Sequence, residues 1–96
     1  MDLQDYRALI DEIDDKLLKL FIDRMDVSRQ IAQYKREHGL PVLDASRERD
    51  KLAVIGDKAG DEFRSYAQTL YNLLFELSRA YQERVGQKFE TSSNLT

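Results

Sequence analysis

Residues 2–37 form an uninterrupted run without Gly or Pro, and this run carries a seven-residue repeat. Two positions of the repeat, three residues apart, are apolar or aromatic in nine of ten cases, as in helices that pack along a seam. These positions hold Leu3, Ile10, Leu17, Arg24 and Ile31, and then Tyr6, Ile13, Leu20, Val27 and Tyr34. The pattern predicts one continuous helix of about 35 residues, roughly 50 Å long.

The length of this helix limits how a chain of 96 residues can fold. A compact protein of this size has a radius of gyration of about 12–13 Å, so the helix overhangs anything that the remaining residues could cover. A second copy of the chain would cover the overhang if the two long helices packed against each other. We therefore predict an intertwined homodimer.

The few Gly and Pro residues divide the rest of the chain. Gly39 and Pro41 mark one turn, Gly56 and Gly60 mark a second break, and Gly86 precedes a polar segment. The predicted helices therefore span about 2–37, 44–58 and 61–85, and their predicted N-caps are Asp2, Asp44 and Asp61. No segment alternates as a strand does, so we predict an all-α fold with a three-helix protomer. Its domain would span 1–86, followed by a flexible tail at 87–96.

Composition excludes several classes of function. The chain has no cysteine and a single histidine, His38, which argues against disulfides, thiol chemistry and zinc sites. The net charge of −3 argues against bulk binding to nucleic acid or to an anionic membrane. Neither a signal sequence nor an apolar run long enough to cross a membrane is visible. We therefore predict a cytoplasmic protein without a metal, a cofactor, or a nucleic-acid or membrane partner.

Polar residues that interrupt the apolar helix faces are the candidate site residues. Arg24 and Lys35 fall inside the apolar sector of the first helix, roughly 16 Å apart, with Ser28 between them. Glu48, next to Arg47, falls among the apolar residues of the second helix. An ordinary alternative is that the long cationic side chains reach out to solvent, or that Glu48 neutralises Arg24 or Lys35 in a buried pair.

The third helix adds Ser78 and Gln82, one turn apart beside its apolar stripe, where an ordinary core boundary is the alternative. Across the three helices the inward-facing cations outnumber the acids, which favours a buried anion. The set predicts a pocket for a small dicarboxylic molecule, with Glu48 accepting a hydrogen bond from a hydroxyl. No nucleophile–base pair or Gly-rich loop is visible, so any chemistry would rest on positioning and electrostatics.

Several motifs carry a resemblance to a known family. They are Tyr6-Arg7-Ala8-Leu9-Ile10-Asp11-Glu12-Ile13-Asp14, Leu17-Leu18, Arg24, Ala32-Gln33-Tyr34-Lys35, Pro41-Val42, Asp44-Ala45-Ser46-Arg47-Glu48-Arg49, Glu76-Leu77-Ser78 and Gln82. Over residues 6–82 the chain resembles the all-helical (AroQ-class) chorismate mutases, in a free-standing, monofunctional form. The resemblance implies an interlocked dimer that rearranges chorismate to prephenate, toward phenylalanine and tyrosine, without a cofactor.

The resemblance also implies the roles of individual residues. The implied catalytic residues are Lys35, Gln82, Arg24 and Glu48. The implied substrate-binding residues are Arg7, Arg24, Lys35, Asp44, Arg47, Glu48, Ser78 and Gln82. Arg7 would reach the site from the partner chain and bind the substrate carboxylates, and Lys35 and Gln82 would donate to the ether oxygen. An amide at position 82, where some relatives have Glu, implies activity at neutral pH.

Two other functions remain open on the sequence. The first is an isochorismate-pyruvate lyase of the same fold, which also breaks an ether C–O bond in a cationic pocket. The second is a non-catalytic helical partner of a shikimate-pathway enzyme. Some free-standing relatives are activated by a synthase, so a shikimate-pathway synthase is a candidate partner of this chain.

Overall fold

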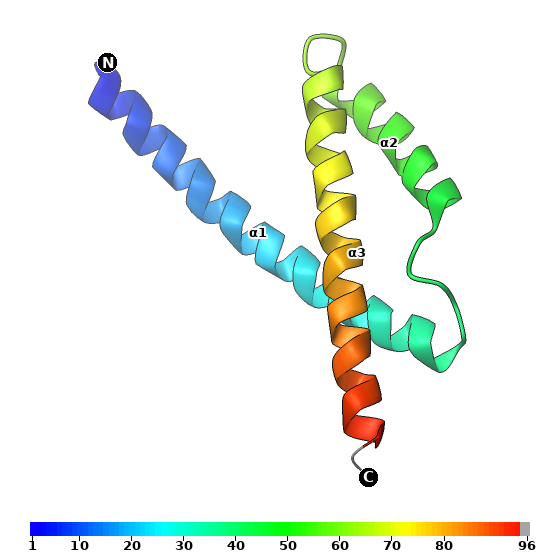
Figure 1. The fold of residues 1–96 in the computed structure, drawn as a ribbon. Helices are drawn as coiled ribbons and strands as arrows, with labels where there is room; N and C mark the ends of the chain where they lie inside the picture. The colour runs from blue at the N-terminus through cyan, green and yellow to red at the C-terminus, as the bar shows by residue number, and fades with distance from the viewer. Residues whose placement is uncertain (95–96) are drawn as a thin grey trace.

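The computed structural model describes the backbone of residues 1–94 and the side chains of residues 1–87. It contains three helices, α1 (Leu3–Glu37), α2 (Ala45–Ala59) and α3 (Arg64–Asn94), and no strand within residues 1–94 (Figure 1). The predicted all-α class and the single long N-terminal helix are confirmed.

Both ends of α1 follow from local interactions. The Asp2 carboxylate accepts from Asp5 N–H at 3.0 Å, and the Asp5 carboxylate accepts from Asp2 N–H at 3.0 Å, which is a reciprocal capping box. At the other end Gly39 adopts φ 66°, a left-handed conformation that favours glycine. The helix therefore begins and ends where the sequence predicts.

The second and third helices agree with the prediction in part. The side chain of Asp44 caps α2 as predicted, because it accepts from Arg47 N–H at 3.0 Å. The prediction that Asp61 caps the last helix is wrong: residues 61–63 form a turn, closed by Phe63 N–H to the Gly60 carbonyl at 3.2 Å. Helix α3 starts at Arg64 because this turn lies between it and Gly60.

The predicted end of the last helix, at residue 85, is also wrong, because α3 continues to Asn94. One glycine inside a helix costs only about 1 kcal/mol relative to alanine, and no proline follows Gly86. The tail that we predict to be flexible, 87–96, lies mostly beyond the side chains that the structure describes. Its flexibility, and the domain boundary at residue 86, stay predictions.

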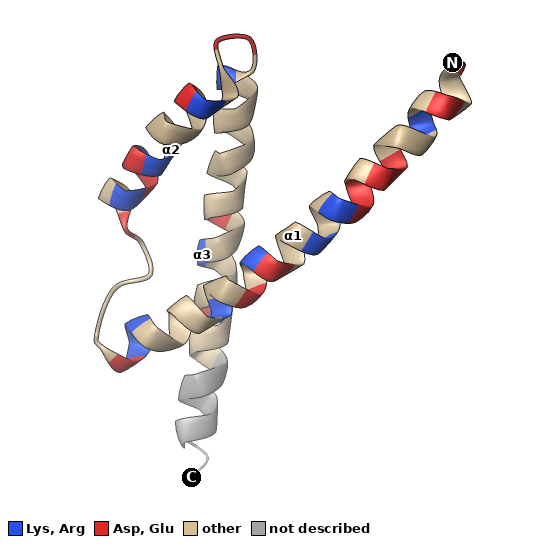
Figure 2. Cartoon of the chain, turned by 180° about the vertical axis from the view of Figure 1, so that it is seen from behind, with Lys and Arg blue, Asp and Glu red and all other residues tan. Residues whose placement is uncertain are grey.

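Helix α3 is the central element, since α1 and α2 each pack on it and not on each other within the described residues (Figure 1). Residues 65–75 of α3 carry no charge, and this length of the helix is tan in Figure 2. Helix α2 lies close against it at Gly56, where an added Cβ would lie 3.2 Å from Arg64 Cγ. Gln68 Nε2 donates to the Leu52 carbonyl at 3.4 Å and Arg64 pairs with Asp57 at 2.9 Å, which fixes α2 along α3.

The outward-facing part of α1 beside its crossing with α3 is polar. Arg29 Nη2 donates to Asp26 Oδ1 at 2.8 Å, and this hydrogen bond, with the charge of Arg29, lowers the pKa of Asp26. Both side chains are about half exposed, so the pair contributes little to stability.

The apolar residues of the chain are poorly covered. Among residues 1–87 the buried apolar side chains are Ala32, Phe75 and Val85 alone, whereas Leu20 is 64% exposed. The N-terminal half of α1 projects away from the other helices (Figure 1), and the radius of gyration is 17.4 Å. The surface measures 7770 Å², whereas a compact protein of this mass exposes about 5,700 Å². The overhang expected from the length of α1 is therefore present, and much of its surface is apolar.

None of the helices in the described part of the chain combines the length and the apolar character that a membrane span requires.

Gly60 in the α2–α3 turn allows the backbone conformation there to be tested, and Gly86 inside α3 serves as the control. Gly60 has φ 82° and ψ 166°, a region that residues with a Cβ avoid, whereas Gly86 is helical; an added Cβ would have nothing within 4 Å at either. We expect Gly60→Ala to lower the free energy of unfolding by about 1–3 kcal/mol through backbone strain. The matched control Gly86→Ala should raise it by up to about 1 kcal/mol through helix propensity. Urea denaturation followed by circular dichroism measures both free energies of unfolding. Changes of the same sign would contradict the backbone strain that we expect for alanine at position 60.

Candidate active site

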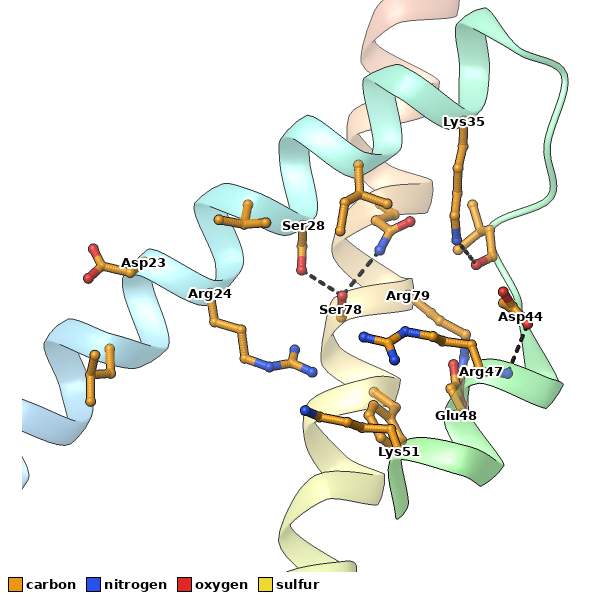
Figure 3. Close-up of a pocket in the computed structure, with 16 residues that line it drawn as sticks. Asp23, Arg24, Ser28, Lys35, Asp44, Arg47, Glu48, Lys51, Ser78 and Arg79 are labelled. Atoms are coloured by element: carbon orange, nitrogen blue, oxygen red, sulfur yellow. Dashed lines mark hydrogen bonds and ion pairs between the residues drawn. The ribbon is translucent and has the colours of Figure 1, made fainter. Parts of the chain in front are cut away.

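A cavity of about 640 Å³ lies where α1, the loop before α2, α2 and α3 meet (Figure 3). Sixteen residues from these segments line it. They are Leu20, Asp23, Arg24, Val27, Ser28, Ile31, Lys35, Val42, Asp44, Arg47, Glu48, Lys51, Phe75, Ser78, Arg79 and Gln82.

The structure brings together seven of the eight substrate-binding residues implied by the resemblance, and Ser28 with them. Arg7 is the exception. It lies about 25 Å before Arg24 along α1, on the part of the helix that overhangs the rest of the chain. Arg7 cannot reach the cavity of its own chain from there.

A chain of buried polar side chains crosses the contact between α1 and α3. The Ser28 and Ser78 hydroxyls lie 2.7 Å apart, and Gln82 Nε2 donates to Ser78 Oγ at 3.2 Å. Ser28 is 4% exposed and Gln82 is 6% exposed. Gln82 Oε1 has no hydrogen-bond partner among the described residues. An unpaired buried oxygen is costly, so Gln82 Oε1 is an acceptor that the described residues leave unused.

Lys35 connects the end of α1 to the following loop. Its Nζ donates to the Val42 carbonyl at 2.7 Å, which leaves two of the three ammonium protons for other acceptors. The neighbouring Arg36 points elsewhere and donates to the Gly86 carbonyl at 2.9 Å, on α3. Of these two adjacent cations, only Lys35 lines the main cavity.

Three further cations reach the cavity from two helices. Arg24 on α1 and Arg47 and Lys51 on α2 extend toward the same space in Figure 3. None of the three has an acidic partner within the described residues. Counting every lining residue, five Lys and Arg face three Asp and Glu, so the cavity has an excess of two positive charges.

The acidic residues of the cavity are partly occupied by protein groups. Asp44 accepts from the Arg47 backbone in its capping role. Glu48 pairs through Oε1 with the guanidinium of Arg79, so the alternative in which it neutralises Arg24 or Lys35 is wrong. No three His, Asp or Glu side chains in the described part of the chain come together as a metal site would require.

Sequence reasoning missed three charged residues of the cavity, Asp23, Lys51 and Arg79. Lys51 follows Arg47 by four residues and Arg79 precedes Gln82 by three, so each shares a helix face with a residue that was identified. This spacing was the available signal. Lys51 belongs to a charge run and Arg79 lies beside a boundary serine, and such residues are usually solvated.

Comparison with known proteins identifies the family. The family model for chorismate mutase type II matches residues 6–83, which include every site residue discussed above. The chain belongs to this family. A chorismate mutase of Methanocaldococcus jannaschii is 40% identical over 85 residues, which cover 85% of each chain.

Two longer proteins also match. The T-protein of Haemophilus influenzae is 29% identical over 79 residues, and the bifunctional chorismate mutase/prephenate dehydratase of Buchnera aphidicola is 33% identical over 93 residues. The aligned regions cover 21% and 24% of those proteins, so the chain corresponds to one part of each. No solved structure gives a significant match.

The polar chain between α1 and α3 can be tested by removing its central hydroxyl. Ser78→Ala leaves both Ser28 Oγ and Gln82 Nε2 without their partner, so we expect the free energy of unfolding to fall by about 1–3 kcal/mol. Ser28→Ala should cost less, since the bond between Gln82 and Ser78 remains. Ser46→Ala, at an exposed position of α2, is the control for helix propensity. Chemical denaturation measures the stability of all three variants. A Ser78→Ala protein as stable as the control would show that the hydrogen bonds among Ser28, Ser78 and Gln82 do not stabilise the fold.

Proposed function

We propose that this protein is a chorismate mutase that converts chorismate to prephenate by an intramolecular Claisen rearrangement. The observation that carries the proposal is the cavity, whose two excess positive charges match a dicarboxylate substrate in a chain of this family. The similarity to the M. jannaschii chorismate mutase supports the same reaction.

The reaction requires little chemistry from the protein. The ether C–O bond breaks while a new C–C bond joins the end of the enolpyruvyl group to the ring, so no group is lost and no cofactor is needed. The cavity would hold the flexible side chain folded over the ring, and this conformational restriction lowers the entropic part of the barrier. Fixed donors would stabilise the negative charge that grows on the ether oxygen.

Two donors are available for that oxygen. Lys35 is anchored to the Val42 carbonyl and would direct a remaining N–H into the cavity. A rotation of the Gln82 amide would give its Oε1 to the Ser78 hydroxyl and free its N–H groups for the substrate. Arg24 and Arg47, which have no acidic partner in the described residues, would bind the carboxylates.

The remaining predicted substrate contacts involve the acidic and hydroxyl side chains of the cavity. Glu48 would accept a hydrogen bond from the ring hydroxyl, with Asp44 shaping this end of the cavity. Ser78 lines the cavity beside Gln82, and its hydroxyl would be a further polar contact for the substrate. The cytoplasmic location and a synthase partner stay predictions.

We also infer that the working form is an intertwined homodimer. Each chain exposes about 2,000 Å² more surface than a compact protein of its mass, and this excess is in the range that obligate interfaces bury. The apolar residues on the overhanging half of α1 would pack on a second copy. That packing would bring Arg7 of one chain to the cavity of the other, where it would bind a substrate carboxylate.

The activity is tested by incubating the purified protein with chorismate and separating the products by chromatography. We expect prephenate, and we expect Lys35→Ala to lower kcat by about 10²- to 10³-fold, because the ether oxygen loses its fixed charge. Lys58→Ala, an exposed lysine at the end of α2, is the matched control and should retain full activity. Absence of prephenate would contradict the proposal, and pyruvate formed from isochorismate would favour the lyase.

The contribution of Arg7 from the partner is tested by subunit mixing. Arg7→Ala and Lys35→Ala proteins should each be nearly inactive alone. After subunit exchange, half of the randomly mixed dimers would hold one intact site, so activity should recover to about a quarter of the unmodified level. Recovery of no activity, in a sample where mass spectrometry detects the mixed dimers, would exclude a shared site.

A further inference from the structure

The ion pair between Glu48 and Arg79 joins α2 to α3 at the wall of the cavity (Figure 3). The same two side chains also line a second, smaller cavity of about 240 Å³. This second cavity is otherwise lined by Leu43, Ala45, Arg49, Leu52 and Asn72. The pair therefore borders both cavities.

The pair is accessible to a ligand. The Glu48 side chain is 25% exposed and that of Arg79 is 30% exposed. Arg79 uses Nη1 to donate to Glu48 Oε1, and among the described residues Glu48 Oε2 has no hydrogen-bond partner. One oxygen of the carboxylate is thus held by the protein and the other is available to accept from a hydroxyl.

The positive charge of Arg79 also offsets the negative charge of Glu48 in the cavity. A bare carboxylate would repel a dicarboxylate substrate, and the cavity already contains Asp23 and Asp44. Pairing with Arg79 neutralises Glu48 locally and still leaves a carboxylate oxygen as an acceptor. A guanidinium suits this task because it stays charged, and here it donates through Nη1 to Oε1 alone, which leaves Oε2 as the acceptor.

We propose that Arg79 is a positioning residue, which orients Glu48 toward the ring hydroxyl and so makes recognition of that hydroxyl depend on the α2–α3 ion pair. This inference rests on the proposed chorismate mutase activity. It assigns to Arg79 no contact with the atoms whose bonds change.

The test compares chorismate with an analogue that carries hydrogen in place of the ring hydroxyl. For Arg79→Met we expect kcat/KM for chorismate to fall about 10- to 100-fold, because the charged hydrogen bond that orients Glu48 is lost. For the analogue, which has no hydroxyl to recognise, we expect little change. Arg79→Lys keeps the charge and should restore part of the loss, and Arg84→Met is the control at an exposed site of α3.

A double substitution separates positioning from a general structural effect. If Arg79 acts through Glu48, the protein with Arg79→Met and Glu48→Gln should be no less active on chorismate than Glu48→Gln alone. Equal losses on both substrates, or additive losses in the double variant, would overturn the inference while leaving the mutase activity in place. Unmodified protein that forms no prephenate would instead contradict the proposed function, and this inference with it.

Discussion

The crossing of α1 over α3 is the contact on which the rest of the structure depends. It is made at Ser28 and Ser78, whose hydroxyls lie 2.7 Å apart, and by the buried neighbours Ala32 and Val85. Small side chains at the crossing let the two helices approach closely. Because α2 packs only on α3 in the described part of the chain, the position of α3 sets where the cations of α2 meet those of α1.

Much of this architecture could be predicted from the sequence, because its signals are local. The long helix follows from an apolar repeat without Gly or Pro, and its ends follow from Asp2 and Gly39. The errors have local causes as well. Asp61 looked like a cap but lies in a turn that follows Gly60, and Gly86 looked like a helix end but is tolerated inside α3.

The site was predictable to the extent that its residues break a pattern. Arg24, Lys35 and Glu48 stand out because a charge on an apolar face requires an explanation, and all three line the cavity. Lys51 and Arg79 do not stand out, because each is a charged residue where charge is ordinary. Which acid pairs with which base also depends on how helices cross. For that reason the partner of Glu48, Arg79 on α3, had to come from the structure.

The buried polar chain implies a constraint on how this protein can change over time. In most small proteins the interior is apolar and can be repacked without touching the functional residues. Here Ser28 and Gln82 are more buried than any apolar residue of the described chain, Ser78 is buried nearly as well, and all three line the cavity. Adaptation to heat by a larger or more apolar interior would therefore fill the site. Lineages of this protein would have to gain thermal tolerance at the outer surface of the helices.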